Sequence, residues 1–301
     1  MKAMKRRIEH ATRSVAIALS LLAGADALHA QAPRGTAPET PLLVYDFNLG
    51  MEPADNVDHV KSLGFQGIVT KLKDPPDLLK LDAYVAHIET MDDFQLIPYV
   101  SYSFNNPAAP DIWRAALPVL AGIGAPLWVV VKQSPSDAAV RDLLGLMARE
   151  AEAHGIRAVI YPHYDTDIET ALEASILIHE VGHHNLRNSL HTCHEIRGGH
   201  KDRLAGVVTE HVDETALVAI AGADHDAYVG PSNPFIGWDD VIKPLDEGDV
   251  SLYPFLQALH EAGYQGPVVL QTFGINNNPG HLQRSIRKYA AYTEQLAPGG
   301  R

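Results

Sequence analysis

Residues 260–271 have the sequence HEAGYQGPVVLQ, and this short stretch indicates the fold. A helical segment ends at a glycine, which suits the left-handed position that closes a helix. An apolar run follows within a few residues, and the same order recurs at residues 60–72, 120–133 and 151–163. Uninterrupted apolar runs are typical of strands buried on both faces of a parallel sheet. The repeats therefore predict a chain built from alternating strands and helices.

Eight such strands are expected along the chain. They lie near residues 42–47, 67–72, 95–102, 127–133, 158–163, 188–191, 217–223 and 267–272. With a helix in each gap, this count predicts the α/β class and a single (β/α)8 TIM barrel over residues 42–298. An open doubly wound sheet is the alternative, but YDFNLGMEP at residues 45–53 contains no glycine-rich phosphate loop after the first strand.

The first 30 residues have the order of a secretory signal peptide. Basic residues come first, the apolar run SVAIALSLLAGA occupies residues 14–25, and small residues follow up to Ala30. The apolar run is too short to span a bilayer, so we expect cleavage near Ala30, with an uncleaved anchor as the alternative. Residues 31–41, QAPRGTAPETP, then form a flexible lead-in. These features predict a periplasmic or secreted protein with no membrane segment in its mature form.

The formal charge of the whole chain is −13, and the leader carries five basic and two acidic residues, so the mature chain carries −16. Phosphate backbones and anionic lipids need clustered positive charge, which argues against nucleic acid or a membrane surface as a partner. Cys193 is the only cysteine, so no intrachain disulfide can form. The partners that we expect are a small-molecule ligand and, in a possible homo-oligomer, further copies of the same chain.

Polar side chains follow most of the predicted strands. A barrel of this kind carries its active site at the carboxyl ends of its strands. The residues expected there are Asp46, Lys71, Tyr102, Lys132, Tyr161, His163, His191, His194, Asp224 and Gln271. One or two such residues would be ordinary loop ends, but a ring of them predicts a functional site.

Residues 248–271, GDVSLYPFLQALHEAGYQGPVVLQ, resemble the last helix and strand of the xylose isomerase-like TIM barrels, a family of sugar isomerases and epimerases. Residues 158–163, 185–194 and 220–224 are similar to the fifth, sixth and seventh strands of that family. The resemblance implies a metal-dependent enzyme that isomerises or epimerises a neutral carbohydrate by abstracting a proton next to a carbonyl. It also implies a divalent metal ion such as Zn, Mn, Fe or Co.

The resemblance also implies where the metal ligands lie. The family holds its metal with Glu, Asp, His and Glu at the ends of strands five to eight, and the two Glu move the proton. In this chain the matching positions carry His163, His191 with His194, Ala221 and Gln271. Alanine cannot bind a metal, so the predicted ligands are His163, His191, His194 and Gln271. Imidazole favours Zn or Fe over Mg, and no carboxylate remains at the usual acid and base positions.

Catalytic and binding roles follow from side-chain chemistry. His163 or His194 can act as a base near neutral pH, and Lys132 can hold the charge of an enolate. Asp224 is a further candidate base, ligand or partner of a ligand. The candidate substrate-binding residues are Asp46, Lys71, Tyr102, Tyr161 and Trp238. Each has an ordinary alternative: a hydrogen-bonded structural histidine, a surface lysine, or a core aromatic.

Three other functions remain open. The same proton abstraction can begin a lyase or hydratase reaction (β-elimination) on a keto-sugar or keto-glycoside, and a barrel of this kind can also bind sugar without catalysis. Residues 179–183 form a literal HExxH motif, which on one continuous helix would hold zinc in a metallopeptidase. We expect instead that the helix ends there and that Gly182 caps it, far from the strand carboxyl ends.

Overall fold

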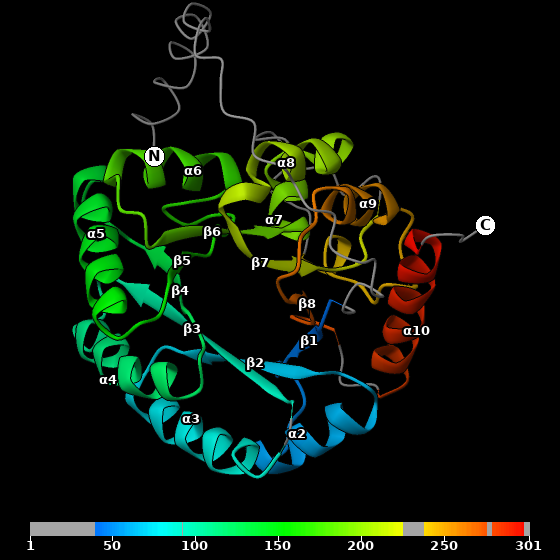
Figure 1. Cartoon of the computed structure of the whole chain (residues 1–301), viewed down its shortest axis with the longest axis horizontal. Helices are drawn as coiled ribbons and strands as arrows, with labels where there is room; N and C mark the ends of the chain where they lie inside the picture. Colours follow the sequence, from blue (N-terminus) through cyan, green and yellow to red (C-terminus); the bar gives the residue numbers. More distant parts are fainter. Residues whose placement is uncertain (1–39, 92, 225–237, 276–278, 298–301) are drawn as a thin grey trace, which may run out of the picture. The chain divides into compact units, whose positions relative to one another are not determined.

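The computed structural model describes residues 40–91, 93–224, 238–275 and 279–297. Its strands form one closed parallel barrel in the order β1 to β8, with helices around it (Figure 1). The strands are β1 (Leu42–Tyr45), β2 (Gly67–Leu72), β3 (Gln95–Ser103), β4 (Leu127–Lys132), β5 (Ala158–Ile160), β6 (Leu186–His191), β7 (Thr215–Ile220) and β8 (Val268–Leu270). The predicted (β/α)8 barrel is confirmed.

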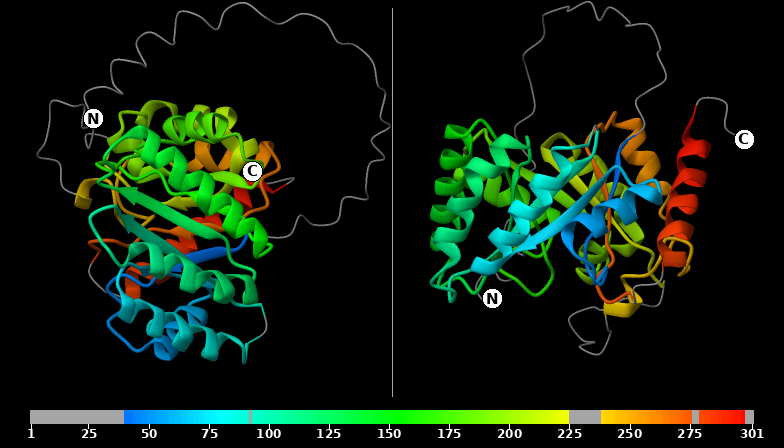
Figure 2. Two further views of the ribbon diagram at one scale, coloured as in Figure 1. Left: turned by 90° about the vertical axis from the view of Figure 1, so that its left-hand side faces the viewer. Right: turned by 90° about the horizontal axis from the view of Figure 1, so that it is seen from below.

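Helices lie outside the strands, as both turned views in Figure 2 show. They are α2 (Pro53–Ser62), α3 (Pro75–Ile88), α4 (Ala109–Gly122), α5 (Asp137–Ala153), α6 (Ala171–Val181), α7 (Thr192–Arg197), α8 (Leu204–His211), α9 (Tyr253–Glu261) and α10 (Pro279–Leu296). Short 3₁₀ turns are η1 (Lys201–Arg203), η2 (Val212–Glu214) and η3 (Trp238–Asp240). No helix among the described residues is long and apolar enough to cross a bilayer. The predicted signal peptide and residues 31–39 of the lead-in lie outside the described part of the chain.

Side-chain alternation along the strands divides the apolar residues into two cores. One core lies between strands and helices, and the other fills the barrel interior. The interior core is rich in large rings, which are those of Tyr45, Tyr99, Trp128 and Tyr161. Trp128 stacks on Tyr161 with ring centroids 4.6 Å apart. The interior is therefore packed, and these rings form the floor beneath the carboxyl ends of the strands.

Strand β5 ends earlier than the sequence predicts, at Ile160 rather than at residue 163. Pro162 follows, and proline has no backbone N–H to donate to a neighbouring strand. The backbone N–H of His163 instead donates to the carbonyl of Ile168 at 2.7 Å, and the carbonyl of Val131 on β4 accepts from Asp167 at 3.2 Å. His163 therefore lies in a turn just beyond the strand.

The HExxH motif is split by the end of α6. The helix stops at Val181, and Gly182 adopts a left-handed conformation with φ 64°. His179 is exposed, and the carboxylate of Glu180 pairs with Arg141 at 3.0 Å. Because α6 leads into the start of β6, the motif lies at the amino ends of the strands. The two histidines do not share one helix face, which removes the basis for the metallopeptidase interpretation.

Candidate functional site

Three histidines gather where β5 and β6 end. His191 is the last residue of β6, and α7 begins directly after it, so His194 lies in the first turn of that helix. The ring centroids of His163 and His194 are 4.1 Å apart, and those of His191 and His194 are 5.4 Å apart. Neighbouring strand residues point to opposite faces, but the change from strand to helix lets both His191 and His194 approach His163.

His163 has a defined tautomer. Its Nδ1 lies 2.8 Å from the carbonyl oxygen of Tyr164, and a carbonyl can only accept, so Nδ1 carries the hydrogen. The lone pair therefore lies on Nε2. Burial lowers the pKa of His163 to about 4, and the positive charges of Lys132 and Lys71 act in the same direction. His163 is thus a neutral base at physiological pH.

The other two imidazoles are also neutral. Burial places the pKa of His191 and of His194 well below the ordinary value, and His163 adds to both shifts. Among the described residues, His194 Nε2 and His191 Nδ1 are buried without a hydrogen-bond partner. His194 Nδ1 accepts from the backbone N–H of Tyr164 at 3.3 Å, and His191 Nε2 lies 3.1 Å from Ser189 Oγ. Two buried ring nitrogens are therefore open to a ligand or to water.

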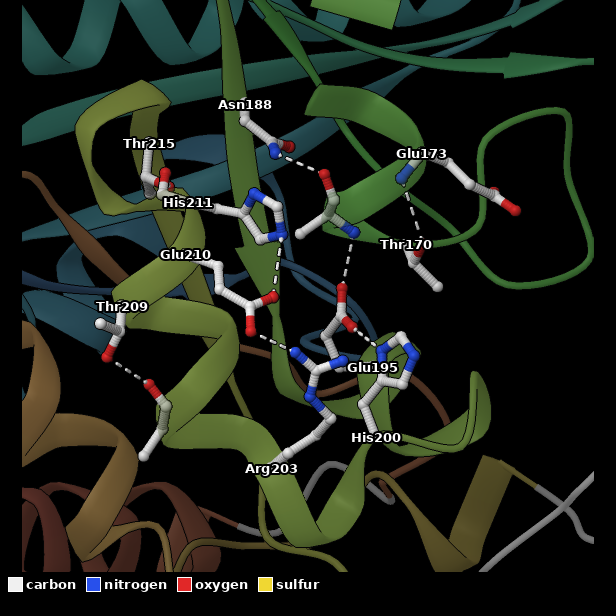
Figure 3. Close-up of polar contacts among 12 residues, drawn as sticks. Thr170, Glu173, Asn188, Glu195, His200, Arg203, Thr209, Glu210, His211 and Thr215 are labelled. Carbon is white, nitrogen blue, oxygen red and sulfur yellow. Dashed lines mark hydrogen bonds and ion pairs between the residues drawn. The ribbon is translucent and has the colours of Figure 1, made fainter. Parts of the chain in front are cut away.

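Helix α7 is held in place by a buried carboxylate. Glu195, 2% exposed, follows His194 and accepts from the backbone N–H of Ala171 at 2.7 Å. Its second oxygen lies 2.6 Å from His200 Nδ1, and Asn188 donates to the Ala171 carbonyl at 2.9 Å (Figure 3). Glu195 also raises the pKa of His200 through this hydrogen bond. The network ties α7 to the start of α6, and it thereby positions His194.

Two lysines lie at the same end of the barrel. Lys71 on β2 stands two positions after Val69, and Lys132 on β4 stands two positions after Val130. Val69 and Val130 belong to the interior core, so both lysine side chains also face inward. Both are partly buried. Burial lowers the pKa of Lys132, and the nearby ammonium of Lys71 lowers it further. Both ammonium groups also lower the pKa of His163, so the two lysines lie near the histidines.

Gln271 and Tyr161 belong to the floor of the site. The amide nitrogen of Gln271 donates to the Tyr161 hydroxyl at 3.3 Å, and the Tyr45 hydroxyl donates to the same oxygen at 3.0 Å. The amide oxygen of Gln271 accepts from the backbone N–H groups of Thr272 and Phe273 at 2.9 Å and 3.0 Å. The oxygen predicted to bind a metal is therefore engaged by the backbone.

Asp46 and Tyr102 are not brought to the histidines, which corrects their prediction as substrate-binding residues. Asp46 directly follows Tyr45, which points inward, so the carboxylate faces the helix layer. There it accepts from Thr70, Lys80 and Tyr84 at 2.6, 2.6 and 3.0 Å. Tyr102 packs in the outer core against Phe104, with ring centroids 5.2 Å apart. Asp224, a predicted catalytic residue, pairs instead with Lys243 at 2.8 Å.

Asp46 is consequently expected to act on stability. Asp46→Asn should lower the free energy of unfolding by about 1–3 kcal/mol, because buried donors lose a charged acceptor. Urea denaturation measures the change, and Asp82→Asn on the exposed face of the same helix, α3, is the matched control. If both variants were equally stable, Asp46 would have no role in stability. If Asp46→Asn were as stable as the wild type but bound ligand more weakly, Asp46 would be a substrate-binding residue.

Aromatic rings border the histidines. Trp238, a predicted substrate-binding residue, lies with its ring centroid 5.6 Å from that of His163 and 5.4 Å from that of His194. The guanidinium of Arg197 stacks on Trp238 at 4.3 Å. Phe47 and Phe273, 5.6 Å apart, extend the aromatic border, and Phe273 is 48% exposed. The sequence interpretation missed both Phe residues, although each stands two positions beyond an inward-facing residue.

The described side chains do not fit the metal site implied by the resemblance. Among the described residues, no group of three or more His, Cys, Asp or Glu is arranged to hold a metal ion. Ala221 offers no donor atom, and the Gln271 oxygen is engaged as described above. Burial and neighbouring basic side chains lower the pKa of His194, and no carboxylate is among the groups that shift it. Within the part of the chain that the structure describes, the imidazoles are present but the oxygen donors of the family's site are not.

The sequence model of the xylose isomerase-like TIM barrels matches residues 57–292. The chain belongs to the xylose isomerase-like TIM barrel family. A search of curated proteins gives no significant match. Solved structures show the fold of this family: 3-keto-D-glucoside 4-epimerase from E. coli matches with a TM-score of 0.64 and 17% identity, over 85% of this chain and 99% of that one.

Two further structures have the same family fold. L-ribulose 3-epimerase matches with a TM-score of 0.61 and 13% identity, over 85% of this chain and 95% of that one. A xylose isomerase-like TIM barrel protein from Mycobacterium smegmatis, solved in complex with magnesium, matches with a TM-score of 0.61 and 15% identity, over 86% of this chain and 98% of that one. At these identities the likeness establishes the fold, while the chemistry has to be argued from the site.

Proposed function

We propose that this xylose isomerase-like barrel is a carbohydrate isomerase or epimerase, with His163 as the base that removes a proton next to a carbonyl. The observation that carries the proposal is the neutral imidazole of His163, whose Nδ1–H is anchored on the Tyr164 carbonyl. Its free Nε2 lies at the barrel end that holds active sites in this fold. The epimerase names of two structural neighbours support the same class of reaction.

The chain's own groups supply the remaining steps of the proposed reaction. Lys132, with its lowered pKa, donates to the oxygen that becomes negative when the proton leaves. For isomerisation, His163 returns the proton to the adjacent carbon, while Lys132 gives a proton to the former carbonyl oxygen and takes one from the neighbouring hydroxyl, which becomes the new carbonyl. For epimerisation, water at the Nε2–H of His194, which has no partner among the described residues, protonates the opposite face of the same carbon, and His163 releases the proton that it removed to solvent. Trp238 and Phe273 offer faces on which a sugar ring can stack.

No step of the proposed reaction uses a metal, because the described donors do not fit the family's metal site. The proposal also includes export to the periplasm or medium, which rests on the leader-like sequence of residues 1–30.

Exchange of carbon-bound hydrogen tests the reaction. Incubation of the protein with aldoses, ketoses and 3-keto-glycosides in D₂O should place deuterium on the carbon next to the carbonyl, which NMR detects. Because neutral His163 is the active form and its pKa is about 4, the rate should stay level on acidification and fall only as the pH drops toward 4.

Two outcomes would contradict this proposal. One is the absence of deuterium in every sugar of the panel, and the other is an acid limb near the ordinary histidine pKa. An unsaturated product formed without exchange in the recovered substrate would assign the β-elimination alternative instead. His184→Asn, a surface histidine at the amino ends of the strands, controls for nonspecific effects on the rate.

A further inference from the structure

The two inward-facing lysines have no counter-charge within the described part of the chain. The ammonium groups of Lys71 and Lys132 form no ion pair and no hydrogen bond with a described residue. Strand β3 lies between β2 and β4, and Lys71 stands opposite Tyr99 while Lys132 stands opposite Ser103, four residues nearer the carboxyl end of β3. The two lysines therefore approach one another through their long side chains, at the carboxyl ends of the strands. Two ammonium groups thus share one end of the barrel, and each is partly withdrawn from water.

The surroundings of the pair are basic or neutral. The charges that act on Lys132 are those of Lys71 and Lys73, and both are positive. The neighbouring histidine rings are neutral and carry open nitrogens, as shown for His194 Nε2. Among the described residues, Asp165 is the one carboxylate that acts on His163. Like charges held close together and partly buried destabilise the protein until an anion joins them.

Two other lysines of the described chain are balanced by a carboxylate. Lys80 lies 2.6 Å from Asp46, and Lys243 lies 2.8 Å from Asp224. The whole chain carries a charge of −13, so an excess of basic residues does not explain the unpaired lysines. The imbalance is local, and it lies beside the base of the proposed reaction.

We propose that Lys71 and Lys132 bind an anionic group of the substrate, so that the ligand is an acidic sugar derivative rather than a neutral sugar. The sugar part of this statement rests on the proposed function, while the anion part rests on the lysine pair alone. A carboxylate or a phosphate between the two ammonium groups restores neutrality and accepts hydrogen bonds from both. The bound anion places the neighbouring part of the ligand beside His163 and Trp238.

Calorimetric titration of the full-chain protein tests the site with three probes: D-glucuronate, D-glucose and inorganic phosphate. An anion should bind about ten- to hundredfold more tightly than glucose, as expected for hydrogen bonds between charged groups. The preference should weaken as salt is added, because partly exposed charges are screened. Preference for glucuronate identifies a carboxylate as the anion, and preference for phosphate identifies a sugar phosphate.

Matched variants locate the effect. The double variant Lys71→Met and Lys132→Met should lose the anion preference, and each single variant should lose part of it. Lys61→Met, an exposed lysine on α2, should keep it. Circular dichroism confirms that the double variant is folded; if it is not, Lys71→Gln alone must still reduce the preference about tenfold.

Three outcomes would overturn the inference: glucose binds as tightly as the anions, none of the probes binds, or the double variant keeps its preference for anions. These outcomes are distinct from failure of the proposed reaction. Anion binding that depends on the lysines, with no deuterium exchange, would retain the binding site and reject the isomerase. Deuterium exchange into neutral sugars, with no anion preference, would retain the isomerase and reject the acidic ligand.

Discussion

His163→Asn is expected to lower kcat/KM for the proposed proton transfer by about 10²- to 10⁴-fold, the usual contribution of a positioned general base. The asparagine amide nitrogen can replace Nδ1 as donor to the Tyr164 carbonyl, so the turn beyond β5 should persist. What the substitution removes is the basic Nε2. Deuterium wash-in measures the proton transfer directly, and it does so whether the product is an isomer or an epimer.

The fold of this variant is checked by its thermal unfolding, and His184→Asn is the matched control because that ring lies on the surface beside Glu152. Exchange by His163→Asn at the wild-type rate would assign the base to another residue, and His194→Asn would then be the next variant to measure. A loss of exchange in both His163→Asn and the control would point to unfolding rather than to chemistry.

Trp128→Ala should cost about 3–5 kcal/mol of unfolding free energy, as large-to-small replacements of buried aromatic residues do. The side chain of Trp128 is fully buried in the barrel interior. Its ring stacks on Tyr161 at 4.6 Å and on His191 at 5.4 Å, and its Nε1 donates to Ser189 Oγ at 3.0 Å. The deletion leaves a cavity beneath the histidines and removes one of the hydrogen bonds of the Ser189 hydroxyl, which keeps the Ile160 carbonyl and His191 as partners.

Trp128→Phe separates the two contributions. It keeps a ring in the interior but removes the indole donor, so it should cost about 1–2 kcal/mol. Urea denaturation of both variants gives the comparison, and Leu79→Ala, which truncates an exposed leucine on α3, should change stability little. A cost below about 1 kcal/mol for Trp128→Ala would mean that the interior can collapse around the missing ring.

The sequence by itself determined the barrel, because the pattern that reports it is local. A helix that ends at glycine and an apolar run that follows are visible in windows such as residues 260–271, and β2 was predicted to the residue. Strand order in a parallel barrel places every strand end at one face, so Lys71, Lys132 and His163 could be assigned to one site from sequence. The split of the HExxH motif by Gly182 was likewise predictable from the capping preference of glycine.

The tertiary structure decided which of these side chains face one another. A shift of one residue sends a strand side chain to the opposite face, and this is why Asp46 and Tyr102 lie in the helix layer. The pairing of the Gln271 oxygen with the backbone and the tautomer of His163 depend on neighbours that come into contact only in the folded chain. The lysines show the same limit. Their positions follow from the strand pattern, but the absence of a carboxylate partner among the described residues depends on segments that are distant in the sequence.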